Sequence, residues 1–145
     1  MKQITIDSKV YKTLAESVGN LAPETGAVIG AYDASPDAVM LVWFDKKPSA
    51  DIYIPSANAI TAVVQKWMQE NAHFCGIVHS HPFGFPELSA TDMKSAVRIM
   101  ESNRMDSMLL GLFHGGEGIL HVYRITIDEN GTPRTEKVEY IIKEE

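Results

Sequence analysis

Hydrophobic positions recur along the chain with two different periods, and the shorter period predicts strands. Ile4 and Ile6 alternate with polar residues, as in a short edge strand. Two apolar runs, 27–31 and 39–44, are separated by a polar, proline-containing segment, and we expect them to form a buried hairpin. Further strands are predicted at 52–54, 74–78, 108–113, 119–127 and 138–142.

Three other segments place apolar residues at helical spacing. The first begins after Asp7 or Ser8, either of which can cap a helix, and ends at the Gly19-Asn20 pair. The third runs from about 89 to 103. The second follows Ser56, and its apolar face consists of Ile60, Val63, Val64, Trp67 and Met68. This mixture predicts an α/β fold in which a mixed, curved β-sheet is flanked by helices. Since no repeat or linker divides the sequence, we expect a single domain over residues 1–145.

Composition narrows the class of protein. Thirteen Lys and Arg against nineteen Asp and Glu give a net charge of −6, which argues against a nucleic-acid partner. A lone cysteine, Cys75, excludes an internal disulfide and a cysteine-rich zinc site, and we expect it to be a small core residue. The first seven residues lack the apolar core of a signal peptide, and no apolar run approaches the ~20 residues that span a bilayer. We therefore expect a cytoplasmic protein without membrane contact.

The segment from Gly76 to Asp92 carries the candidate chemistry. Residues two apart on a strand point to the same face, so His79 and His81 can present two imidazoles together. Asp92 can add a third ligand from the start of the next helix, which is the number of protein ligands typical of a catalytic zinc site. Each signal has a simpler explanation: a His-x-His alone is weak evidence, and Ser89 with Asp92 matches a helix capping box.

Taken together, these residues resemble a known signature. The H-x-H-P-x6-S-x-x-D pattern of the JAB/MPN metalloproteases, often called the JAMM motif, is matched by His79, His81, Pro82, Ser89 and Asp92. The family's motif begins upstream with a catalytic glutamate just before a glycine-rich apolar strand. Residues 23–30 resemble that element and nominate Glu24, although the run from Glu24 to Gly30 is one residue shorter than the family's usual form.

The resemblance implies a fold and an activity. The fold would be the cytidine-deaminase-like JAB/MPN sandwich of a compact prokaryotic-type member. One Zn²⁺ per chain would be held by His79, His81 and Asp92, with Glu24 as general base and Ser89 stabilising the oxyanion. Glu87, which lies between His81 and Ser89 in the sequence, is a rival candidate for the general base. Deamination of a nucleobase is excluded, because that chemistry needs a distant C-x-x-C pair and the chain has one cysteine.

The resemblance also implies a partner. The substrate would be a peptide or isopeptide bond at the extended C-terminal tail of a ubiquitin-like or sulfur-carrier protein of the β-grasp kind. The sequence leaves the oligomeric state open, a homodimer included. The alternative function is that of a non-catalytic scaffold or interaction module of the same fold. Relatives of that kind have lost metal ligands, whereas this chain keeps each one.

Overall fold

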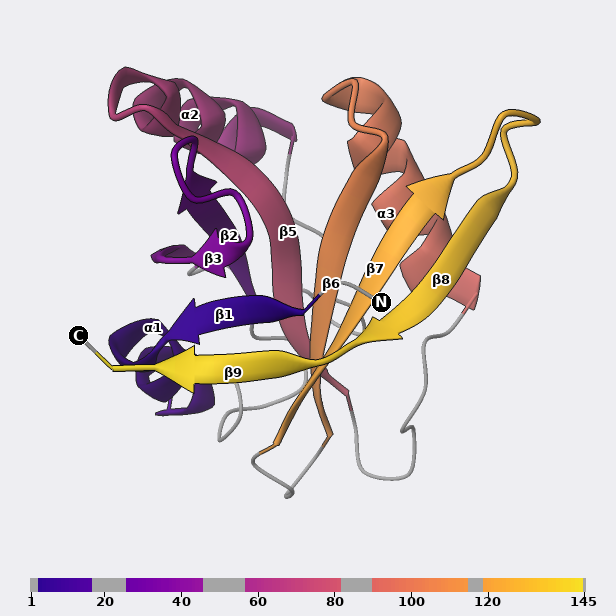
Figure 1. Cartoon of the computed structure of the whole chain (residues 1–145). Helices are drawn as coiled ribbons and strands as arrows, with labels where there is room; N and C mark the ends of the chain where they lie inside the picture. Colours follow the sequence, from indigo (N-terminus) through magenta and orange to yellow (C-terminus); the bar gives the residue numbers. More distant parts are fainter. Residues whose placement is uncertain (1–2, 17–25, 46–56, 82–89, 115–118, 145) are drawn as a thin grey trace.

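The computed structural model describes residues 3–16, 26–45, 57–81, 90–114 and 119–144. Within them, the central feature is a six-stranded sheet with the spatial order β4-β2-β5-β6-β7-β8 (Figure 1). Its strands are β2 (Gly26–Tyr32), β4 (Leu41–Asp45), β5 (Ala72–His81), β6 (Ser107–His114), β7 (Leu120–Ile127) and β8 (Pro133–Val138). Neighbouring strands are antiparallel except β5 and β6, which are parallel. The predicted mixed sheet is confirmed.

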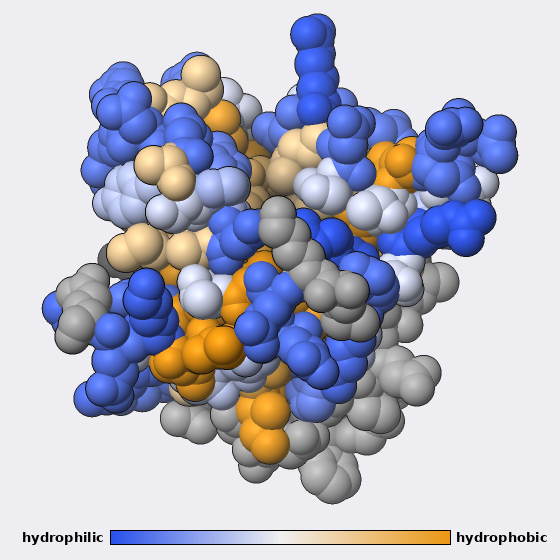
Figure 2. Space-filling model, viewed as in Figure 1, coloured by the Kyte–Doolittle hydropathy of each residue, from blue (hydrophilic) through white to orange (hydrophobic). Residues whose placement is uncertain are grey.

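A second, three-stranded sheet lies beside the first. Its order is β3-β1-β9, formed by β3 (Ala38–Val39), β1 (Ile4–Asp7) and β9 (Tyr140–Lys143), and both pairings are parallel. The prediction of an edge strand at Ile4 and Ile6 was therefore wrong, because β1 is the central strand of this sheet. Figure 2 shows apolar side chains gathered over β1 and β9 on the face in view, and Ile141 and Ile142 of β9 are both exposed.

Two predicted strands turn out to be pairs of strands that serve different sheets. The run 39–44 breaks at Met40, whose amide donates to the carbonyl of Gly30, so that β3 joins the small sheet and β4 pairs with β2. The run 138–142 breaks at Glu139, whose carbonyl accepts from the amide of Ile4. The hairpin of β2 and β4 is otherwise as predicted.

The helices are α1 (Ser8–Leu14), α2 (Ala57–Gln69) and α3 (Ala90–Ser102). The predicted cap of the first is confirmed, since the Asp7 carboxylate accepts from the Val10 amide at 3.2 Å. In the described part of the chain, none of the helices combines the length and apolar character that a bilayer crossing requires. The predicted helix end at Gly19-Asn20 and the strand at 52–54 lie outside the described residues.

The central sheet separates two halves of the core. On one face, α2 and α3 pack against Val28, Ile77 and Leu110, while on the other face α1 and the small sheet pack against Ala27 and Val78. The buried face of α2 is largely as predicted, because Ile60, Val63 and Trp67 are buried. Met68 departs from this pattern, with 66% of its surface exposed. The order of layers is thus helices, central sheet, then small sheet with α1.

Strand β5 contains an irregularity that decides which face its side chains take. The pairing with β2 shifts register between Ile29 and Gly30, which leaves Cys75 as an extra residue on β5. As a result, Cys75 packs with Val78 on the small-sheet side, whereas Ile77 packs among the helices. Simple alternation puts Cys75 on the same face as His79, and the bulge makes that inference wrong.

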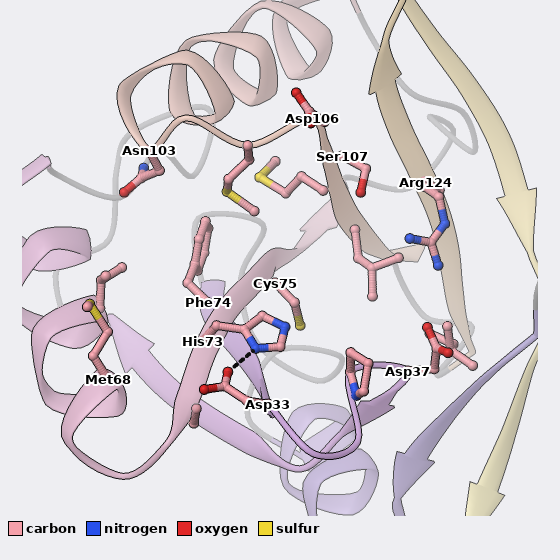
Figure 3. A pocket seen from close by; sticks show the side chains of 17 residues that line it. Asp33, Asp37, Met68, His73, Phe74, Cys75, Asn103, Asp106, Ser107 and Arg124 are labelled. Carbon is pink, nitrogen blue, oxygen red and sulfur yellow. Dashed lines mark hydrogen bonds and ion pairs between the residues drawn. The ribbon is translucent and has the colours of Figure 1, made fainter.

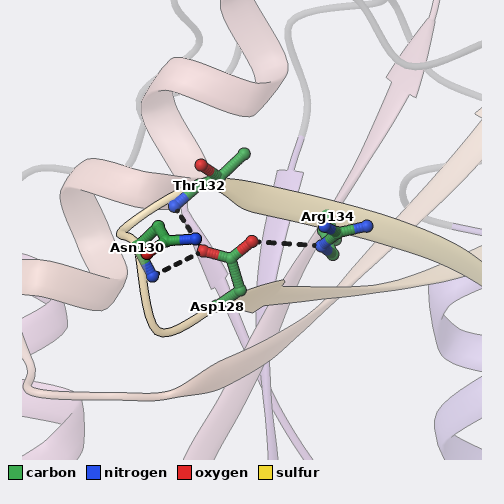
Figure 4. Close-up of polar contacts among 4 residues, drawn as sticks. All are labelled: Asp128, Asn130, Thr132 and Arg134. Carbon is green, nitrogen blue, oxygen red and sulfur yellow. Dashed lines mark hydrogen bonds and ion pairs between the residues drawn. The ribbon is translucent and has the colours of Figure 1, made fainter.

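The β7–β8 hairpin closes through a turn organised by one carboxylate. Asp128 accepts hydrogen bonds from the amides of Asn130 and Thr132, both at 2.9 Å, and from Nε of Arg134 at 3.1 Å (Figure 4). Gly131, with φ of 79°, occupies the left-handed position that this turn requires. The hydrogen bond from the Thr132 amide has the largest effect on the pKa of Asp128 and lowers it. With the hydrogen bonds from Arg134 and the Asn130 amide, it outweighs the opposing effect of desolvation and holds this pKa below its usual value.

Candidate metal centre

His79 lies near the end of strand β5, between two paired strands. Gly26 of β2 is its partner on one side and Leu112 of β6 on the other. Its side chain is only 3% exposed, and it is the one buried polar side chain among the residues described. Since Ile77 and Leu112 pack among the helices, alternation places His79 on the face covered by α2 and α3.

The strand continues to His81, as the His-x-His pattern predicts, and there it pairs with His114, which the sequence pattern favoured as a structural or exposed residue and did not nominate for the site. His81 and His114 are partners in the parallel ladder between β5 and β6. Neighbouring strands are about 4.8 Å apart, so the backbone brings these two residues together at the ends of their strands. Their side chains lie outside the described part of the structure. The signal that identifies His114 is strand register, which the sequence does not state.

For the remaining predicted site residues, the structure describes only the backbone or nearby positions in the sequence. Glu24 and Ser89 lie outside the described residues, and so does the rival base Glu87. Gly26, two positions after Glu24, is the residue opposite His79. Asp92 is the third residue of α3, in its first turn, with its side chain outside the described part. We call the region of Gly26, His79–His81 and Leu112–His114 the histidine end of the sheet.

The described side chains alone form no cluster of three metal-ligating residues. What can be tested is whether His79 suits a metal. An imidazole buried near the end of a central strand, with its Nε2 atom shielded from solvent, is well placed to be a ligand. Two imidazoles and a carboxylate form a donor set that zinc accepts. The donor chemistry of the motif therefore fits zinc.

Cys75 does not belong to this region, and its role as a core residue is consistent with its surroundings. It is half-buried on the small-sheet face, and its Sγ contacts the carbonyl of Ile29 at 3.5 Å. Burial raises the pKa of its thiol to about 12, with the positive charge of Arg124 acting in the opposite direction. A thiol held protonated at neutral pH is a poor ligand and a poor nucleophile.

The comparisons with known proteins bear on the fold. No protein-family model matches the chain, and no curated protein matches it by sequence. The solution structure of protein DSY2949 from Desulfitobacterium hafniense is similar, with a TM-score of 0.70 and 19% identity over 99% of this chain and 94% of that one. The crystal structure of AF2198, a JAB1/MPN domain protein from Archaeoglobus fulgidus, has a TM-score of 0.52 and 14% identity over 97% of this chain and 100% of that one. The chain thus has a mixed α/β fold distantly similar to that of a JAB1/MPN domain protein.

Proposed function

We propose that this chain is a zinc-dependent peptidase or isopeptidase of the JAB/MPN type. The observation that carries the proposal is that His79, the first histidine of the motif, is buried at the end of a central strand in a fold similar to that of a JAB1/MPN domain protein. The finer classification as a cytidine-deaminase-like sandwich is part of the same proposal. The non-catalytic scaffold remains the alternative, and nothing in the described residues favours it over the enzyme.

The roles of the residues follow from their chemistry. His79, His81 and Asp92 would hold one Zn²⁺, which when bound supplies Lewis acidity towards the scissile carbonyl and its attacking water. Glu24 would accept a proton from that water and deliver it to the leaving amine. The Ser89 hydroxyl would donate a hydrogen bond to the oxyanion of the tetrahedral intermediate. The buried position of His79 supports this arrangement, because a shielded imidazole keeps one orientation.

The metal is tested first, by elemental analysis of protein purified without chelator. We expect about one zinc per chain, and we expect His79→Ala to lose it. His73→Ala is the matched control, because His73 lies on the same strand far from the histidine end, where its Nδ1 is 2.9 Å from the Asp33 carboxylate. That variant is expected to keep its zinc. A wild-type protein that is purified without metal and also takes up none when zinc is added would refute the proposal.

The substrate is tested separately. We propose an extended tail ending in small residues, which reaches the histidine end and is recognised by Phe83 and Phe85, the aromatic residues that follow His81 in the sequence. The enzyme is expected to cleave directly after a Gly-Gly tail on a β-grasp protein, with product masses as the readout. Phe85→Ala is expected to raise KM more than it lowers kcat, whereas the exposed aromatic Tyr32 can be replaced by Ala without effect. Equal cleavage of unstructured chains would contradict the tail and leave the zinc peptidase intact.

A further inference from the structure

The central sheet splits at the end opposite the histidines. The ladder between β5 and β6 begins at the pair Gly76–Leu109. On one side of the split, residues 72–74 of β5 are paired with β2, and on the other side Ser107 and Met108 of β6 are paired with β7. Figure 1 shows β5 and β6 diverging towards this end. We call residues 72–75 and 107–108, with the space between them, the split end.

A cavity of about 700 Å³ occupies the split end (Figure 3). Its walls come from α2, β1, β5, β6 and β7, from the segment after α3, and from the segment between β2 and β3. This volume lies within the range of about 300–1,000 Å³ that is typical of small-molecule sites. The cavity is well separated from His79, which lies at the other end of β5.

One side of the cavity is largely apolar. Met68 and Phe74 line it, with Asn103 on the same side (Figure 3), and Met105 is a further apolar lining residue of the cavity. Met68 was expected in the core, yet it is 66% exposed at this opening. Methionine side chains adapt to the shape of an apolar ligand. This side of the cavity therefore suits an aliphatic or aromatic tail.

The other side of the cavity carries charge. Figure 3 shows Arg124 and Asp37 on this side, across Phe74 and Cys75 from Met68. The influence of Arg124 on the Cys75 thiol is consistent with a guanidinium that reaches inward. Arg124 has no ion pair with any residue in the described part of the chain, so its donors are available to a carboxylate. His73 and Asp33 are bonded to each other. Asp37 also has an interaction of its own, but a carboxylate has several acceptor sites and can receive an ammonium group in addition.

We propose that the split end binds a free amino acid with an apolar side chain. Arg124 binds its carboxylate, Asp37 receives its ammonium group, and Met68, Phe74 and Met105 contact its side chain. A ligand with only a negative charge fits less well, because the cavity is lined by three aspartates against Arg124 and His73. The site is independent of the proposed zinc centre.

The experiment is a titration of the full chain followed by NMR, with EDTA present because amino acids also bind zinc. L-phenylalanine is expected to shift the amide signals of residues 73–76 and 107–109 and to leave those of 79–81 unchanged. N-acetyl-L-phenylalanine lacks the ammonium group, L-phenylalaninamide lacks the carboxylate, and glycine lacks the tail. Each of these three ligands is expected to bind at least about ten-fold more weakly than L-phenylalanine. A loss of this size is the effect of removing a charge-assisted hydrogen bond or a buried side chain.

Variants make the test specific to the charged side. Arg124→Gln is expected to weaken phenylalanine binding at least ten-fold, whereas Arg98→Gln on the exposed surface of α3 leaves it unchanged. Asp37→Asn is expected to weaken phenylalanine and to strengthen its N-acetyl derivative. Thermal melts check that each variant folds; if Arg124→Gln does not, the ligand series on the wild-type chain decides. Equal binding of the four ligands, or no saturable binding below about 10 mM, would overturn the proposal.

Discussion

The two ends of strand β5 differ in how they are held. At the histidine end, His79 has a strand partner on both sides and a buried side chain. At the split end, Phe74 has a partner on β2 and faces a cavity instead of β6. The same strand thus provides one rigid end, suited to holding ligands in a fixed geometry, and one open end, suited to admitting a molecule.

Gly76 lies at the boundary between these two ends. A Cβ atom at this position would collide with the carbonyl oxygen of Leu109, so the strands meet here at a distance that only glycine permits. One residue earlier, the bulge at Cys75 displaces β5 from regular pairing. A close contact followed directly by a bulge explains why the sheet is closed on one side of Gly76 and split on the other.

The largest expected effect concerns the histidine end. If that end is catalytic, Glu24→Gln should keep zinc bound and reduce turnover by about 10²–10⁴-fold, because a general base is lost while the ligands remain. Glu87→Gln is the matched control and should retain most of the activity. Zinc content and initial rates on a Gly-Gly fusion are the measurements. Near-normal rates in Glu24→Gln with a loss in Glu87→Gln would transfer the role of base to Glu87.

The second prediction addresses the boundary itself. Gly76→Ala is expected to destabilise the fold by about 3 kcal/mol, since the new methyl group meets backbone that cannot move aside. Gly111→Ala is the matched control on β6, where a Cβ would meet the Leu120 and Val78 side chains at 3.0 Å, and it should cost about 1 kcal/mol. Urea unfolding measures both. Equal losses of stability would contradict the explanation that the close contact between β5 and β6 at Gly76 requires glycine.

The smallest expected effect is at the turn that closes β7 and β8 beside the split end. The pKa of Asp128 is lowered in the folded chain, so its carboxylate contributes stability that is present above its unfolded pKa of about 3.9 and is lost as the pH falls through the folded value. Asp128→Asn should therefore lower Tm slightly at pH 7, and the difference from wild type should shrink below pH 4. Glu129→Gln in the same turn is the control. A difference that grows at low pH would contradict this account.

Much of this architecture could be predicted from apolar periodicity. The helix following Ser56 and the strand leading into His79 are where the pattern placed them. The breaks at Met40 and Glu139 were missed because the residues on either side are apolar or strand-forming in both sheets. A pattern of two-residue alternation records burial, but it does not record which of two sheets provides that burial.

The site was less accessible to sequence reasoning than the fold. The spacing of His79 and His81 predicted two residues at one strand end, and strand β5 does run through both. The bulge at Cys75 and the pairing of His114 with His81 depend on register between strands distant in sequence, which no local pattern contains. The ligand and base roles of Glu24, Ser89 and Asp92 stay predictions, because their side chains lie outside the described residues.

The small sheet has a consequence for the order in which the molecule can assemble. Strand β1 is synthesised more than a hundred residues before its partner β9. Until β9 emerges, Ile4 and Ile6 lack the neighbour that helps to bury them. Contacts between such distant segments slow folding, because a long loop must close before they form. During synthesis, β1 is thus a strand with an open edge, and this edge is exposed to aggregation until β9 pairs with it.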